Sequence, residues 1–272
     1  MIDPAILGFY GLGLEQQRLQ DARRSVEFWR TRDILARHLP RPPGTVLDIG
    51  GGPGAYALPL ADDGYRVTLV DPVPLHVEQA TRASRQQERG LHRALCGDAR
   101  DLPVDEQHDA VLMLGPLYHL TAADERARTW EEARRCLRPG GVVVAAAVSR
   151  FYSGWQALDA GHMPLPGVAE ALETQMTTGE YRNPSGDERL WTTAYFHTPD
   201  ELAAEARTAG LTVRALIAVE GPAKFLSAIG DHMTDPERRR HVLDVQRRIE
   251  EEPTILGMSQ HILAVAQRPE TS

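Results

Sequence analysis

A glycine-rich turn beside a carboxylate is the part of the sequence best suited to chemistry. The turn follows directly on the apolar run of residues 45–49 and consists of Gly50, Gly51, Gly52 and Gly54. A chain that leaves a strand through this many glycines can bring bare backbone against a ligand at the start of the next helix. By themselves the glycines are ambiguous. Gly50, Gly52 and Ala55 also fit the dinucleotide-binding pattern, and a tight turn without a ligand is a third interpretation.

Asp48, two residues before the first glycine, favours a cationic ligand. Its carboxylate would repel a pyrophosphate at this turn but would attract a sulfonium amino acid, which is positively charged on its sulfur and its amine. Asp71 ends the run of residues 67–70, where a carboxylate can accept hydrogen bonds from both hydroxyls of a ribose. NAD-binding proteins use the same device, so Asp71 indicates a nucleoside and Asp48 favours S-adenosylmethionine (SAM) over NAD.

A third carboxylate, Asp98, closes the next element, where it could accept a hydrogen bond from an adenine amino group. An isolated Asp in a loop is usually a turn former. The three carboxylates together, each at the carboxyl end of an expected strand, argue for one nucleoside site at one edge of a sheet.

The elements that would position these residues alternate along the chain. Short apolar runs predict strands, which are separated by stretches with helical periodicity. Unbroken apolar strands that alternate with helices indicate a parallel sheet covered on both faces. The expected strands are 45–49, 66–70, 109–114, 142–148, 211–219 and 261–266, and the expected helices are 25–39, 75–87, 124–137 and 236–252. Thr198, Pro199 and Glu201 predict one further helix start with a capping box.

With these segments the sequence resembles the class I SAM-dependent methyltransferases of small molecules. The matching segments are 48–54, 69–72, 97–99, 109–117 and 137–141. The resemblance is close over residues 44–150 and looser over 198–266. It implies an α/β fold with a Rossmann-like, mostly parallel seven-stranded sheet whose last strand is antiparallel. It assigns the cofactor site to Asp48, Gly50, Gly51, Gly52, Gly54, Asp71, Pro72, Asp98, Ala99, Leu114 and Gly115.

We expect four parts in the chain. Residues 1–43 form an N-terminal helical leader, 44–150 the SAM-binding core, 151–197 a substrate-covering insertion, and 198–272 the second half of the core sheet with an inserted helix. The leader supplies two further candidates for the cofactor, Tyr10 and Arg18, with Arg18 directed at the SAM carboxylate. A docked terminal helix with a surface arginine is the alternative.

The loop after the fourth strand should lie beside the transferable methyl group, and it supplies the catalytic candidates Tyr118 and His119. An imidazole titrates near neutrality and can take a proton from an attacking hydroxyl. A packing role for His119 is the alternative, because methyl transfer needs in-line alignment more than it needs a base. Gly115 stands where DNA amino-methylases carry Asn or Asp, which argues against a DNA base as acceptor.

The insertion is rich in aromatic residues, which could stack on a planar or apolar acceptor or form a small core of their own. The acceptor-binding candidates are Tyr152, Trp155, His162, Arg182, Tyr195 and His197. No clustered metal ligands are apparent, so we expect no metal site, although one loop carboxylate could still meet a divalent ion.

Composition narrows the class of protein. Apolar residues make up 42% of the 272 residues and charged residues 25%, which is typical of a globular chain. The formal charge of −8 disfavours nucleic acid and anionic membranes as partners. Two cysteines without C-x-x-C spacing indicate neither a disulfide framework nor a zinc site. We expect a soluble cytoplasmic protein, monomeric or homodimeric.

The sequence therefore predicts an enzyme that transfers a methyl group from SAM to a small metabolite, to oxygen in preference to nitrogen or carbon. Three rivals remain open. One is another SAM reaction, such as an intramolecular cyclisation that releases methylthioadenosine. The second is an NAD-dependent oxidoreductase, which Asp48 and the absence of a Tyr-x-x-x-Lys pair disfavour. The third is a non-catalytic protein that binds SAM or a partner.

Overall fold

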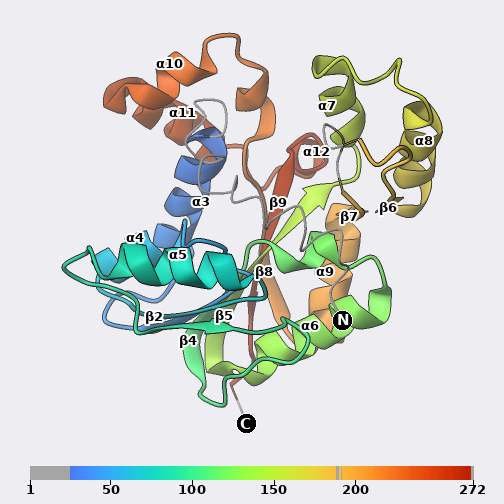
Figure 1. The fold of residues 1–272 in the computed structure, drawn as a ribbon. Helices are drawn as coiled ribbons and strands as arrows, with labels where there is room; N and C mark the ends of the chain where they lie inside the picture. Colours follow the sequence, from blue (N-terminus) through green and yellow to red (C-terminus); the bar gives the residue numbers. More distant parts are fainter. Residues whose placement is uncertain (1–24, 188–189, 191, 271–272) are drawn as a thin grey trace.

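The computed structural model describes residues 25–187, 190 and 192–270. The leader residues Tyr10 and Arg18 lie outside this part of the chain. A parallel sheet forms its centre, with seven main strands: β1 (Thr45–Ile49), β2 (Arg66–Asp71), β3 (Arg93–Cys96), β4 (His108–Met113), β5 (Leu137–Ser149), β8 (Thr212–Ala218) and β9 (His261–Gln267). They lie in the order β3-β2-β1-β4-β5-β9-β8 (Figure 1).

The strands β1 to β5 are parallel, and β9 runs antiparallel to both of its neighbours, β5 and β8. Two short strands of the insertion, β6 (Glu180–Tyr181) and β7 (Ala194–His197), extend the sheet at the carboxyl end of β5. The predicted fold class, a Rossmann-like and mostly parallel sheet with an antiparallel last strand, is confirmed.

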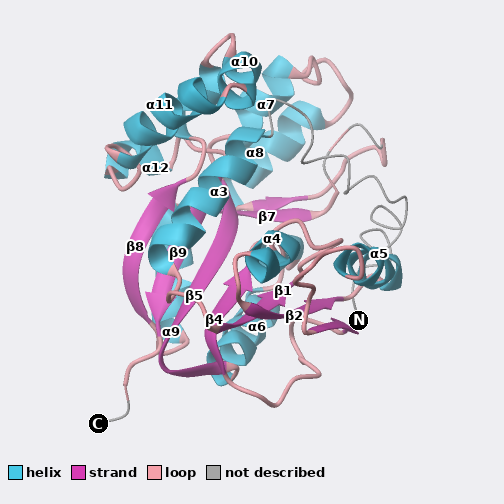
Figure 2. Cartoon of the chain, turned by 90° about the vertical axis from the view of Figure 1, so that its left-hand side faces the viewer, coloured by secondary structure: helices cyan, strands magenta, loops and turns pink. Residues whose placement is uncertain are grey.

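Helices cover both faces of the sheet (Figure 2). On one face lie α3 (Ser25–His38), α4 (Ala57–Asp62) and α5 (Pro74–Ser84), whose buried residues pack with the Val and Leu side chains of β1 and β2. On the other face α6 (Ala123–Arg135) and α9 (Pro199–Thr208) pack through Trp130 and Leu202 against β4 and β5. Strands buried on both faces explain why the sequence showed unbroken apolar runs rather than alternation.

Two predicted boundaries differ from the structure by five residues, and the others differ by less. β5 begins at Leu137 rather than at 142, because Leu137 pairs with His108 and the register then shifts before Ala110. Gly140, at φ +77°, carries the chain through this irregularity. The expected helix 236–252 ends at Arg247 as α11 (Pro236–Arg247). The capping box of Thr198 and Glu201 is present as predicted.

Short helices connect the remaining strands. They are η1 (Pro116–His119) after β4, α7 (Ser153–Asp159) and α8 (Val168–Thr178) in the insertion, and η2 (Gly221–Phe225), α10 (Ile229–Thr234) and α12 (Pro253–Leu256) between β8 and β9. No helix within the described ranges is long and apolar enough to cross a bilayer.

A buried arginine fixes α3 against the β8 edge of the sheet. The Arg30 side chain is fully buried; its Nε donates to the Val219 carbonyl at 3.0 Å and Nη2 to Glu250 at 2.5 Å. Arg37, two turns further along α3, bonds the same Glu250 carboxylate at 2.7 Å. These bonds hold α3 close to the carboxyl end of β8.

Candidate active site

The glycine turn is shaped to leave its backbone open. The amide nitrogens of Gly50 and Gly51 donate to the Val70 carbonyl at 2.7 and 3.3 Å, which fixes the turn against β2. Gly52 has φ +56°, and a Cβ placed on it would meet no atom of the described residues within 4 Å. None of these residues therefore covers its bare backbone at the carboxyl edge of the sheet, where a ligand of an open α/β sheet binds.

Asp71 braces this turn. Its Oδ2 accepts from the Gly52 amide at 2.8 Å, while Oδ1 accepts from the Val73 amide at 2.9 Å and lies 3.0 Å from Nδ1 of His76. A carboxylate offers about four lone-pair sites, so Asp71 keeps capacity for a further donor such as a ribose hydroxyl. Sequence reasoning missed His76, which lies on the first turn of α5 and points back to the end of β2.

Asp48 is a buried carboxylate that lacks a complete set of partners. It is 1% exposed, and its Oδ2 has no hydrogen-bond partner among the described residues. Burial, with a smaller contribution from the negative charge of Asp71, raises the pKa of Asp48 to about 7. A cation or donor bound at the turn would offset this cost. The residues present therefore fit a positively charged nucleoside such as SAM.

Asp98, the residue predicted to contact the adenine, already forms hydrogen bonds with another side chain of the protein. Arg100 bonds both oxygens of Asp98, at 2.9 Å from Nε and 2.5 Å from Nη2, and holds the pKa of this carboxyl below its usual range. Arg100 also pairs with Glu125 at the start of α6. Ala99 packs at the edge of the core. An adenine amino group would share Asp98 with this guanidinium, a competition that the sequence pattern did not reveal.

The loop after β4 touches the glycine turn. A Cβ on Gly115 would lie 3.4 Å from the Gly50 carbonyl oxygen, and a Cβ on Gly50 would lie 2.8 Å from Cγ of Pro116. The ring of Tyr118 is buried, and its hydroxyl donates to the Leu114 carbonyl at 3.3 Å. His119 is half-buried with its ring centroid 4.7 Å from that of Tyr118. The structure thus brings the predicted catalytic loop beside the predicted cofactor turn.

Two insertion residues lie near the carboxyl edge of β5. Tyr152 is buried, with Nζ of Lys224 4.8 Å from its ring centroid. Burial, followed by the charge of Glu220, raises the pKa of the Tyr152 hydroxyl. Trp155, on the first turn of α7, is 61% exposed. Tyr152 therefore borders a cluster of charged side chains, and Trp155 offers an indole to solvent.

Two other insertion candidates face away from α3. Arg126 of α6 stacks 3.6 Å above the Tyr195 ring, and the fully buried His197 lies 3.4 Å from Glu205 of α9. Burial opposes ionisation of Glu205, but His197 and Arg126 lower its pKa to about 2. These contacts tie β7 to α6 and α9, so Tyr195 and His197 hold the insertion on the sheet rather than lining an acceptor site.

The remaining two candidates for acceptor binding, Arg182 and His162, have their contacts within the insertion. Arg182 is exposed and pairs with Glu180. His162 lines a cavity of about 40 Å³ inside the insertion, together with Gln156 and Leu172 among others. That volume suits a water molecule rather than a metabolite. Sequence composition showed that the insertion is aromatic and polar, but it did not show which side chains face inward.

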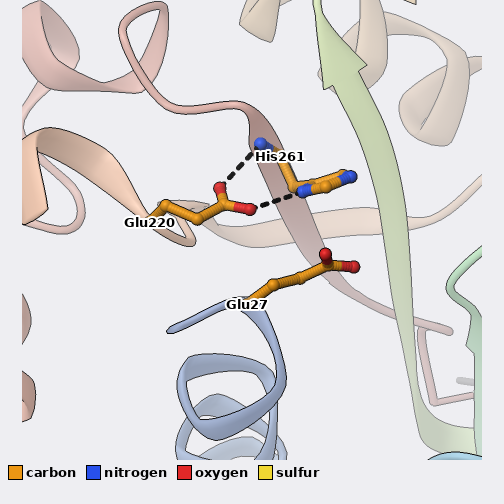
Figure 3. Close-up of side chains that lie close together, drawn as sticks. All are labelled: Glu27, Glu220 and His261. Carbon is orange, nitrogen blue, oxygen red and sulfur yellow. Dashed lines mark hydrogen bonds and ion pairs between the residues drawn. The ribbon is translucent and has the colours of Figure 1, made fainter. Parts of the chain in front are cut away.

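A cluster that the sequence did not reveal lies at the β8–β9 corner. Glu27 of α3, Glu220 after β8 and His261 of β9 point toward one another (Figure 3). They offer three ligand-type atoms within 4.8 Å of one another. We expected no such grouping from the sequence, because the three residues are far apart in the chain.

Comparison with known proteins supports the prediction of a methyltransferase domain in the central part of the chain. Residues 47–145 match the family described as methyltransferase domain. A ubiquinone biosynthesis O-methyltransferase of Methylocella silvestris is 32% identical over 138 residues, which is 44% of this chain and 50% of that protein. An uncharacterised methyltransferase of Mycobacteroides abscessus is 33% identical over 120 residues, 43% of either chain. This chain thus spans half or less of the length of these relatives.

Solved structures of methyltransferases share the fold of this protein over most of the chain. A SAM-dependent methyltransferase of Methanosarcina mazei superimposes with a TM-score of 0.60 at 18% identity, covering 88% of this chain and 98% of the other. The 1,6-didemethyltoxoflavin-N1-methyltransferase of Burkholderia thailandensis gives 0.58 at 19% identity, with 98% and 88% covered. At these identities the structures establish the fold alone, and residues 47–145 match the methyltransferase domain that the sequence predicts.

Proposed function

We propose, from the premise that residues 47–145 match the methyltransferase-domain family, that the protein binds SAM at the glycine turn and methylates a small-molecule acceptor. One observation carries the proposal. The buried Asp48 carboxylate, whose Oδ2 lacks a partner in the described part of the chain, lies two residues before a turn with open backbone at Gly52. This pairing of negative charge and bare backbone suits a cationic nucleoside and would repel a pyrophosphate.

Each residue at the turn has a separate task in this proposal. Gly50, Gly52 and Gly54 admit the methionine part of the cofactor, and Asp48 offsets its positive charge. Asp71 accepts from the ribose, and Asp98 faces the adenine. SAM supplies an electrophilic methyl group when bound. The chain's own contribution is to align the acceptor with that methyl and to exclude water, which supplies much of the acceleration.

We place the acceptor between the loop after β4 and the carboxyl ends of β5 and β8. Leu114, Gly115, Tyr118 and His119 border this region on one side. Tyr152 and the exposed Trp155 border it on the other. An oxygen acceptor is favoured because the matched relative from Methylocella silvestris is named an O-methyltransferase. We further propose a cytoplasmic enzyme, monomeric or homodimeric, that acts on a metabolite rather than on nucleic acid.

A two-step experiment tests the proposal. Thermal-shift titration with SAM, NAD and no ligand should show stabilisation by SAM alone, because a ligand that binds only the folded state stabilises it by mass action. A panel of hydroxyl- and amine-bearing acceptors is then screened for release of S-adenosylhomocysteine. Stabilisation by NAD and not by SAM would refute the proposal.

The cyclising rival shares every cofactor residue named above, so binding does not separate it from methyl transfer. Product analysis does. Release of methylthioadenosine without an acceptor indicates the intramolecular reaction, whereas acceptor-dependent S-adenosylhomocysteine indicates methyl transfer.

A further inference from the structure

The first feature of the β8–β9 corner is a histidine held by a buried carboxylate. Oε1 of Glu220 lies 2.6 Å from Nδ1 of His261. Its Oε2 accepts from the His261 backbone amide at 2.9 Å and from the Ser259 hydroxyl at 3.1 Å. Glu220 is 1% exposed, so its geometry is fixed by the fold. A carboxylate at Nδ1 sets the tautomer of the neutral imidazole, with its proton on Nδ1 and a lone pair on Nε2.

The second feature is where this histidine lies. His261 is the first residue of β9 and pairs with Val148 near the carboxyl end of β5. Because β9 is antiparallel, its first residue lies at the edge where β1, β4 and β5 end. β9 is separated from β4 by one strand, and His261 lies three residues beyond the level of Met113, the last residue of β4. Ordinary strand spacing and rise per residue therefore put the His261 Cα roughly 14 Å from the Met113 Cα. An acceptor of metabolite size, together with the imidazole side chain, can span that distance.

The third feature is the direction of the side chain. Residues of a strand alternate between the two faces, and Leu263 and Val265 pack on the face covered by α3, so His261 points to that face as well. Figure 3 shows its Nδ1 turned to Glu220 and its Nε2 turned away from Glu220, with the Glu27 carboxylate below the ring. Within the described residues no hydrogen bond to Nε2 is recorded.

We propose that His261, oriented by Glu220, is the general base that takes the proton from the acceptor hydroxyl. The proposal rests on the proposed function, methyl transfer to oxygen, and it names a residue outside the loop that the sequence analysis favoured. As the acceptor oxygen bonds to the methyl carbon and the carbon–sulfur bond breaks toward sulfur, the hydroxyl proton passes to Nε2. The positive charge lost by the sulfonium then resides on an imidazolium paired with Glu220.

The surroundings of His261 suit this task. Burial opposes a charged imidazole, but the charges of Glu220 and Glu27 outweigh burial and the positive charge of Lys224, so the pKa of His261 is raised. Tyr152 of the insertion lies close enough to Glu220 for that charge to raise the pKa of its hydroxyl, although burial is the larger cause. The cluster therefore stabilises the imidazolium that proton transfer creates. His119, in contrast, packs against the Tyr118 ring in the β4 loop.

The same three side chains have the composition of a metal site, and the hydrogen bonds favour proton transfer instead. Both Glu220 oxygens already accept from donors of the chain, and Nδ1 of His261 is directed to one of them. A divalent ion between them would have to displace these bonds. We therefore expect methyl transfer that EDTA does not reduce; activity lost with EDTA and restored by a divalent ion would overturn the assignment of His261 as base.

The pH dependence of turnover is the first test. Wild-type kcat should rise with pH along a limb whose apparent pKa lies above 6.5, the ordinary value for histidine. His261→Asn should lower kcat about 100-fold and abolish this limb. Glu220→Gln should shift the limb to lower pH, and Glu27→Gln should shift it less. His241→Asn, on the exposed side of α11, is the matched control and should match wild type.

The second test does not need turnover. Nitrogen-15 NMR of the imidazoles in the ligand-free protein should show neutral His261 with its proton on Nδ1 and a pKa that falls in Glu27→Gln. A proton on Nε2, or His261→Asn with wild-type kcat and an unchanged limb, would overturn the proposal. Wild-type protein that fails to bind SAM would instead refute the proposed function, while the NMR result still reports on the histidine–glutamate pair.

Discussion

Two buried carboxylates at the same edge of the sheet have pKa values that are shifted in opposite directions. Asp48, before the glycine turn, has its pKa raised to about 7 by burial and by Asp71. Glu220, at the β8–β9 corner, is equally buried, yet the neighbouring His261 and its hydrogen bonds lower its pKa. Glu220 has its hydrogen-bond donors, and the positive charge of Lys224, within the chain. Asp48 has no cationic partner among the described residues, which indicates that its counter-charge comes with a ligand.

The open backbone of Gly52 gives the largest expected effect. Gly52→Val places a side chain where the cofactor would lie, so SAM affinity should fall about 100-fold or more, equivalent to roughly 2.7 kcal/mol. Gly161→Val is the matched control: Gly161 also has positive φ, and no atom of the described residues lies within 4 Å of its Cβ position. Both variants carry the same backbone strain. Calorimetry should show lost affinity only in Gly52→Val; equal affinities would place the ligand elsewhere.

A network far from the turn should affect stability alone. Glu205→Gln removes the negative charge that pairs with Arg126 and His197. It should lower the free energy of unfolding by roughly 2 kcal/mol, because it leaves a buried guanidinium without its counter-ion. Urea denaturation measures this loss. SAM affinity should stay at the wild-type value, and a parallel loss of affinity would show that the α6–α9 face takes part in binding.

The raised pKa of Asp48 predicts a gain in stability on removing its charge. An acid whose pKa is higher in the folded state binds its proton more tightly there, so the ionised carboxylate destabilises the fold above pH 7 and this cost vanishes toward pH 4. Asp48→Asn should therefore stabilise the ligand-free protein by about 1 kcal/mol at pH 8 and by little at pH 5. Thermal unfolding of both proteins at the two pH values checks this. Equal stabilities of wild type and Asp48→Asn at pH 8 would contradict the raised pKa of Asp48.

The smallest effect is expected at Trp155. Because its indole is mostly exposed, Trp155→Ala should change stability by less than about 0.5 kcal/mol. If the indole contacts the acceptor, KM for the acceptor rises while SAM affinity is unchanged. An unchanged KM would leave Trp155 as a surface residue of α7.

The cofactor side could be predicted from the sequence because its parts are consecutive. Asp48 and the glycines lie within seven residues, and Asp71 and Asp98 each follow a strand. Parallel strands bring such positions to one edge whatever the remaining side chains do. What the sequence did not show was the local competition for Asp98, because the direction of the Arg100 side chain depends on the packing of α6.

The acceptor side was much less accessible to sequence reasoning. In the sequence His261 is simply the first residue of a predicted strand. The role proposed for it depends on Glu220 and Glu27, which belong to other elements that are distant in sequence. Conversely, His197 and Tyr195 were singled out for their type, although the register of β7 with β5 turns them toward α6 and α9. Side-chain direction at a strand end depends on register, and register is set by contacts distant in sequence.

The dependence of SAM affinity on pH tests the central claim most directly. Calorimetry between pH 5.5 and 7.5 avoids most of the titration of the cofactor's α-amino group, whose pKa is about 7.7–8.0. Cationic SAM should bind the ionised form of Asp48, so affinity should weaken as the pH falls below about 7, whereas Asp48→Asn should bind weakly at every pH. Wild-type affinity that is constant over this range, or equal in the variant, would contradict the role assigned to this carboxylate.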